Sequence, residues 1–138
     1  MELERCRGYK SLTVMKQLIF VFVGGGFGSV LRYITVKFFE SHSSIIPYGT
    51  LVSNILGSLC IGIILGMAGK NKALNQHQIL LLATGFCGGF TTFSSFAYEN
   101  HIFLKNGDLT LSALYTIASL IISFVAVFLG VYLTRILI

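Results

Sequence analysis

The segment Thr84–Phe96, TGFCGGFTTFSSF, concentrates residue types that interrupt a helix and free its backbone groups. Adjacent Gly88 and Gly89 weaken a helix, and the Thr91–Thr92 pair that follows does not restore it. Transport proteins use the carbonyls freed at such a break to coordinate cations. The carbonyls of Gly88 and Thr91 are therefore candidate ligands for a small cation. The alternative is a kinked helix that only packs against its neighbours.

Two phenylalanines, Phe93 and Phe96, follow this segment's threonines three residues apart, on one helical face. Phenylalanine in an apolar segment normally faces lipid or the protein core. Here Thr92, Ser94 and Ser95 bracket the two rings. Because the edge of an aromatic ring carries partial positive charge, rings presented edge-on in a narrow passage would favour an anion without binding it tightly.

A second polar position, Asn54, lies inside another apolar run. Its amide needs partners for its donors and its acceptor. Two roles fit: an interhelical hydrogen bond that holds helices together, or an amide that lines a wet path. Neighbouring small and hydroxyl residues at helical spacing are Thr50, Ser53, Gly57 and Ser58.

Hydroxyl groups recur along the last apolar run at Tyr115, Ser119 and Ser123, which are spaced i, i+4 and i+8 on one helical face. Ser112 and Thr116 flank the start of this stripe. The stripe fits either of two roles. It can join helices through hydrogen bonds, or it can replace the water around an anion step by step.

The composition shows what kind of protein positions these residues. The chain is 54% hydrophobic with a mean hydropathy of +0.82. Only 11% of its 138 residues are charged, whereas about 25% is usual in soluble domains. Such a chain cannot cover a soluble core, so we predict an all-α membrane protein. The ten Lys and Arg residues are scattered, which argues against nucleic-acid binding.

Four apolar stretches are long enough to cross a bilayer core of about 30 Å. Their short connectors, 40–44, 70–76 and 106–108, require adjacent helices to run antiparallel. We expect residues 15–138 to form one four-helix domain, preceded by a polar leader at 1–14, with Met15 as an alternative start. The predicted spans are about 18–38, 48–67, 78–103 and 109–137, the third broken mid-membrane.

The positive charges near the spans bear on orientation. Counted from Met15, one side of the membrane carries four: Lys16, Lys70, Lys72 and Arg135. The other side carries three: Arg32, Lys37 and Lys105. This near balance allows insertion both ways round and antiparallel pairing. The leader adds three to the first side, Arg5, Arg7 and Lys10, which favours one orientation.

Span centres carry no ionised side chain, since Arg32, Glu99 and Arg135 all lie near span ends. A proton-coupled drug exporter of this size is expected to place a carboxylate mid-span, so this chain differs from that class. The three histidines also lie near span ends, and none belongs to a recognisable group of catalytic residues. We therefore do not expect an enzyme.

Three motifs, in this order, resemble the Fluc (CrcB-type) family of fluoride channels over roughly residues 15–138. They are GGGFGSVLRY at 24–33, YGTLVSNILGS at 48–58 and GFCGGFTTFSSF at 85–96. The resemblance implies a fluoride-selective channel that passively exports toxic cytoplasmic fluoride through the plasma membrane. It also implies four helices per subunit and an antiparallel dimer with two pores.

The resemblance assigns roles to particular residues. Gly88 and Thr91 match the positions whose carbonyls hold a structural sodium ion at the dimer interface. Arg32 and Glu99 match positions for which we expect vestibule or structural roles. The implied fluoride pathway comprises Asn54, Phe93, Phe96, Tyr115, Ser119 and Ser123.

The polar leader differs from the very short N-terminus usual in this family. Either a homodimer or a heterodimer with an oppositely oriented paralogue is therefore expected, surrounded by membrane lipid. Two other classes remain as alternatives: a four-helix transporter of the multidrug type, and a membrane assembly subunit that transports nothing.

Overall fold

The computed structural model describes residues 2–40, 45–69 and 74–137, and every regular element in these ranges is a helix. Most of the predicted connectors 40–44 and 70–76 lies outside the described residues, as do Lys70 and Lys72 of the charge count. The elements are α1 (Glu2–Glu40), α2 (Tyr48–Gly69), α3 (Gln76–Ile79), the π-helix η1 (Leu80–Cys87), α4 (Gly88–Phe90), α5 (Phe93–Lys105) and α6 (Leu109–Leu137).

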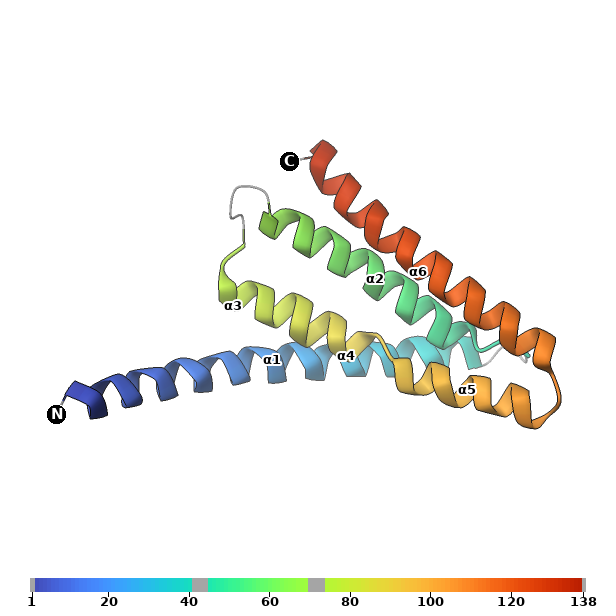
Figure 1. The fold of residues 1–138 in the computed structure, drawn as a ribbon, viewed down its shortest axis with the longest axis horizontal. Coiled ribbons are helices and arrows are strands. Elements are labelled where there is room, and N and C mark those ends of the chain that lie inside the picture. The colour runs from blue at the N-terminus through green and yellow to red at the C-terminus, as the bar shows by residue number, and fades with distance from the viewer. Residues whose placement is uncertain (1, 41–44, 70–73, 138) are drawn as a thin grey trace.

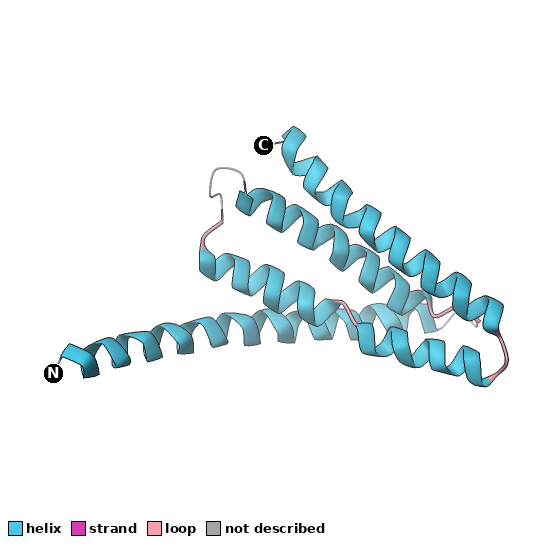
Figure 2. Ribbon diagram, viewed as in Figure 1, coloured by secondary structure: helices cyan, strands magenta, loops and turns pink. Residues whose placement is uncertain are grey.

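Four helical spans among the described residues are long and apolar enough to cross a membrane, which confirms the predicted number. The third span is made of α3, η1, α4 and α5 in succession. Adjacent spans run in opposite directions, so the two chain ends lie at the same end of the bundle (Figures 1 and 2). The chain is thus a multi-pass membrane protein. The spans are Val14–Glu40, Tyr48–Gly69, Gln76–Lys105 and Leu109–Leu137.

Helix α1 begins at Glu2 and continues without interruption to Glu40. The predicted leader is therefore part of the same helix as the first span. Its N-terminal end extends beyond the other spans (Figure 1). The division of the chain at residue 15 stays a prediction.

Glycines allow α2 and α6 to pack backbone against backbone. A Cβ atom at Gly62 would meet the carbonyl of Val127, and one at Gly66 would meet the side chain of Thr134. From the opposite side, a Cβ at Gly130 would lie 2.5 Å from the Leu59 carbonyl oxygen. Lipid offers no hydrophobic drive for helices to associate, so this close approach of small residues supplies the packing energy.

A second glycine interface joins α1 to the third span. Gly24 and Gly28 of α1 face the backbone of η1 and α4, while Gly89 faces the backbone of Gly25. A Cβ at Gly85 would lie 2.9 Å from the Cα of Gly24. The two helices therefore interlock through glycines on both sides, and this fixes the depth at which the third span lies against α1.

The third span is broken, as predicted, but the break falls just after the adjacent glycines. Thr91 and Thr92 have extended backbones, with φ/ψ of −80°/155° and −150°/117°. Gly88 and Gly89 remain helical, and Gly89 has the packing role described above. The π-helix η1 that precedes them was not predicted, since π-helices are rare and occur mostly as single turns inside α-helices.

The glycine contacts make a prediction about stability. Gly28→Ala would place its Cβ 2.8 Å from the backbone nitrogen of Phe90. We expect it to destabilise the protein by about 1–3 kcal/mol, because backbone cannot move aside as a side chain can. The apparent unfolding temperature in detergent measures this. Gly26→Ala is the matched control on the same helix, since its Cβ would meet nothing within 4 Å. Equal stability of the two variants would contradict the interlock.

Candidate functional site at the break of the third span

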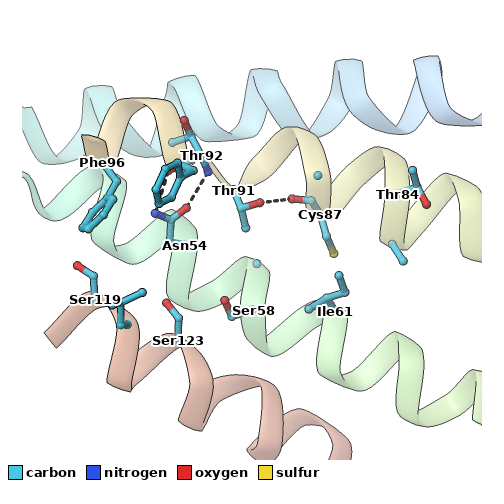
Figure 3. A pocket seen from close by; sticks show the side chains of 15 residues that line it. Asn54, Ser58, Ile61, Thr84, Cys87, Thr91, Thr92, Phe96, Ser119 and Ser123 are labelled. Carbon is cyan, nitrogen blue, oxygen red and sulfur yellow. Dashed lines mark hydrogen bonds between the residues drawn. The ribbon is translucent and has the colours of Figure 1, made fainter. Parts of the chain in front are cut away.

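A groove of about 440 Å³ lies beside the break, with walls from α2, the third span and α6 (Figure 3). None of the described residues that line it is charged. It contains most of the predicted site residues, whereas Tyr115, Arg32 and Glu99 lie outside its lining. The predicted residues that line it are Asn54, Gly88, Thr91, Phe93, Phe96, Ser119 and Ser123.

Asn54 pairs with the backbone of the break. Its Nδ2 donates to the carbonyl of Thr92 at 3.1 Å, and its Oδ1 accepts from the N–H of Thr92 at 2.7 Å (Figure 3). The amide thereby supplies the partner that the N–H of Thr92 lacks at the break, and it gives the Thr92 carbonyl a donor from another helix. Of the two roles open for Asn54, the interhelical hydrogen bond is present. Because an amide has two N–H groups, the second remains for another acceptor.

The carbonyls before the break differ in their hydrogen-bond partners. The carbonyl of Cys87 accepts from both the N–H and the hydroxyl of Thr91, each at 2.9 Å. The carbonyl of Gly89 accepts from Nε of Arg32 at 3.1 Å. No described residue donates to the carbonyl of Gly88 or Thr91. The cation of Arg32 also suits the negative end of the interrupted helix.

Helix α5 begins with Phe93 and Phe96 in contrasting surroundings. Thr92 caps the helix by accepting from the N–H of Ser95 at 3.2 Å. The Phe93 side chain is 77% exposed at the groove, whereas Phe96 is 9% exposed and packs on Tyr115 with ring centroids 5.4 Å apart. The ring centroids of Phe93 and Phe96 are 5.7 Å apart. One ring is thus free to meet another molecule, and the other is held by the core.

Tyr115 is buried behind the groove. Its hydroxyl donates to Oε2 of Glu99 at 2.7 Å, and the hydroxyl of Thr50 donates to Oε1 of the same carboxylate at 2.5 Å. These bonds join α6, α5 and α2. Glu99 and Thr50 also line a second hollow of about 280 Å³ near Pro47. The pathway role of Tyr115 and the vestibule role of Glu99 stay predictions.

Two residues that join helices, Thr50 and Asn100, were given no role by the sequence analysis. For Thr50, its position one helical turn before Asn54 was the feature that could have indicated a polar contact. Asn100 joins α5 to α6, because its Oδ1 accepts from the hydroxyls of Ser112 and Thr116 at 2.9 and 3.0 Å. Because Asn100 stands between Glu99 and His101 near a span end, the sequence did not single it out as it did Asn54.

The pairing of Asn54 with Thr92 predicts a large cost for its removal. Asn54→Ala would leave the N–H of Thr92 without its partner and remove one donor from the Thr92 carbonyl, and we expect a loss of about 1–3 kcal/mol for the unsatisfied N–H. Thermal unfolding in detergent measures the loss. Asn106→Ala, at an exposed residue after α5, is expected to be neutral. If Asn54→Ala proved as stable as this control, the amide would not support the break.

Comparison with known proteins agrees with this architecture. The sequence model described as "CrcB-like protein, Camphor Resistance (CrcB)" matches residues 19–131. A relative from Gloeothece citriformis (strain PCC 7424) is 50% identical over 122 residues, covering 88% of this chain and 98% of its own. A relative from Chlorobium chlorochromatii (strain CaD3) is 40% identical over 118 residues, covering 86% and 92%. Both are named "Fluoride-specific ion channel FluC". The chain therefore belongs to the CrcB family.

Proposed function

We propose that this chain is a subunit of a fluoride-specific ion channel that passively exports toxic fluoride from the cytoplasm. The observation that carries the proposal is an uncharged groove, lined by an amide, hydroxyls and aromatic rings, in a chain half identical to a protein named for this activity. A multidrug-type transporter coupled to protons would need a carboxylate facing the groove. Among the described lining residues there is none.

The groove offers what a fluoride ion needs when it loses water. Fluoride is small and strongly hydrated, so each lost hydrogen bond must be replaced. The Asn54 amide has a spare N–H, and Ser119 has a buried hydroxyl without a partner among the described residues. Ser123 lies one turn farther along α6. Neutral donors bind weakly enough for the ion to leave, as conduction requires.

A second subunit is part of the proposal. The groove has walls from three spans, and Phe93 is exposed at it rather than packed. We propose that an oppositely oriented second copy, or a paralogue in that orientation, closes the groove. The near balance of positive charges counted from Met15 suits such antiparallel pairing.

A structural sodium ion belongs to the same proposal. The carbonyls of Gly88 and Thr91 fit it, because carbonyl oxygen is a hard ligand and neither group has a donor among the described residues. Sodium would supply positive charge that offsets these dipoles and attracts anions. Arg32 and Asn54 donate to the neighbouring carbonyls of Gly89 and Thr92. Neither donates to the carbonyls of Gly88 and Thr91, which therefore remain available to a cation.

Fluoride flux tests the proposed function directly. The protein in liposomes is expected to release fluoride to an electrode and to release chloride at a far lower rate. Phe93→Ala is expected to suppress fluoride release, with Phe22→Ala, at an 81% exposed ring on α1, as the matched control. Equal release of both anions, or of neither, would refute the channel. Normal release by Phe93→Ala would refute the ring's role alone.

Removal of sodium tests the cation site. When sodium is replaced throughout by a larger cation, we expect the oligomer to weaken on size exclusion and fluoride flux to fall, because a larger ion does not fit the same carbonyls. Returning sodium should restore both. If neither the oligomeric state nor the fluoride flux changed when sodium was replaced, Gly88 and Thr91 would be ruled out as sodium ligands.

A further inference from the structure

Helix α6 turns one buried face toward the other helices. The members of this face recur every three or four residues, which is the spacing of a single helical face. The buried residues are Ser112, Tyr115, Ser119, Ala126, Gly130 and Thr134. Ser123, which is half-buried, occupies the remaining turn of the face and lines the groove together with Ser119. The groove thus lies at the middle of this face.

The C-terminal part of the face is held by α2. A Cβ at Gly130 would lie 2.5 Å from the Leu59 carbonyl oxygen, and one at Gly62 would meet the Val127 carbonyl. Helices packed this closely cannot slide or rotate past each other without a clash between backbones. This packing therefore fixes the position of α6 from Val127 onward.

The N-terminal part of α6 is held by Asn100 of α5. Oδ1 of Asn100 accepts from the hydroxyl of Ser112 at 2.9 Å and from the hydroxyl of Thr116 at 3.0 Å. Its Nδ2 donates to the Phe96 carbonyl of its own helix at 3.0 Å, which holds the amide in place. Because Ser112 and Thr116 are about one helical turn apart, a single amide binds α6 at two successive turns.

A second polar contact joins the same two helices but restrains them less. The Tyr115 hydroxyl donates to Glu99 at 2.7 Å. Tyrosine carries its hydroxyl at the far end of a long side chain, and glutamate has more rotameric freedom to lose than a shorter side chain has. The hydroxyls of Ser112 and Thr116 are attached directly to Cβ. The Asn100 contact therefore transmits the position of one backbone to the other more strictly.

Between these two contacts, the hydroxyls that line the groove have no bond to hold them. Ser119 and Ser123 lie between Thr116 and Val127 along α6, and neither hydroxyl has a hydrogen-bond partner among the described residues. The position of the helix, rather than a bond of their own, therefore decides where these hydroxyls point.

We propose that Asn100 is a positioning residue, which holds α6 in the rotation and height that turn Ser119 and Ser123 into the groove. The proposal rests on the proposed function, and it gives a role to an amide that does not line the groove. A polar network whose members are all paired specifies one arrangement of the helices around it. Fluoride needs a donor for each hydrogen bond that it loses with water, so a displaced α6 would weaken its path.

Removal of the amide with and without its partners tests this role in the full-length protein. Asn100→Leu is expected to lower fluoride release from liposomes about tenfold, as for a lost hydrogen bond to an ion, and to lower the ratio of fluoride to chloride release. The triple variant Asn100→Leu/Ser112→Ala/Thr116→Val is expected to release fluoride as slowly. Its unfolding temperature should stay near that of the unmodified protein, because apolar replacement of both sides of a contact is nearly neutral for stability.

Two further comparisons serve as controls. Asn106→Leu removes an exposed amide that follows the same helix, and it is expected to leave fluoride release unchanged. Thr116→Val removes one hydroxyl of the contact and keeps its shape, whereas Thr116→Ser keeps the hydroxyl. We expect Thr116→Val to release fluoride more slowly than Thr116→Ser. Size exclusion checks that each variant keeps its oligomeric state.

The outcomes separate this role from the proposed function. Normal fluoride release by Asn100→Leu would overturn the positioning role and leave the channel standing. Recovery of both stability and fluoride release in the triple variant would show that Asn100 serves stability alone, which also overturns it. If Asn100→Leu lost its oligomeric state, the Thr116 pair would decide, and equal release by these two variants would overturn the proposal. No fluoride release by the unmodified protein would refute the channel and this role together.

Discussion

A backbone that leaves its helix inside a membrane must find new partners for its amides and carbonyls, since hydrocarbon offers none. In this chain the break at Thr91 and Thr92 is supported from two directions. The Asn54 amide on α2 satisfies both groups of Thr92, and Arg32 on α1 satisfies the carbonyl of Gly89. The glycine contacts between α1 and the third span bring these partners within reach. The groove exists because the break is held open in this way.

Charge in this protein supports the scaffold, while neutral groups face the groove. Arg32 is committed to a carbonyl, and Glu99 accepts from Thr50 and Tyr115. The residues that bond to these two charged groups, Gly89, Thr50 and Tyr115, do not line the groove. An anion would therefore meet dipoles of modest strength rather than a fixed cation that retains it. A low charge content serves both solubility in lipid and the weak binding that conduction requires.

Hydropathy was sufficient to predict the four spans. The position of the break was less predictable, because Gly89 is used for packing against α1 and the extended residues are Thr91 and Thr92. The regular stripe of Tyr115, Ser119 and Ser123 suggested one shared environment. The structure divides it, because Glu99 on α5 draws the Tyr115 hydroxyl away from the groove. Such competition between helices, and the π-helical turn, are tertiary effects that spacing alone does not encode.

The pairing of Asn54 with Thr92 also has a consequence for biosynthesis. Chains fold from the N-terminus as they are synthesised, so α1 and α2 reach the bilayer before the third span does. Arg32 and Asn54 are then already in place when the interrupted segment leaves the ribosome. An order of synthesis with the third span first would expose unpaired peptide groups to lipid until their partners arrived. The linear order of the helices thus places the partners of the break in the membrane before the break itself is synthesised.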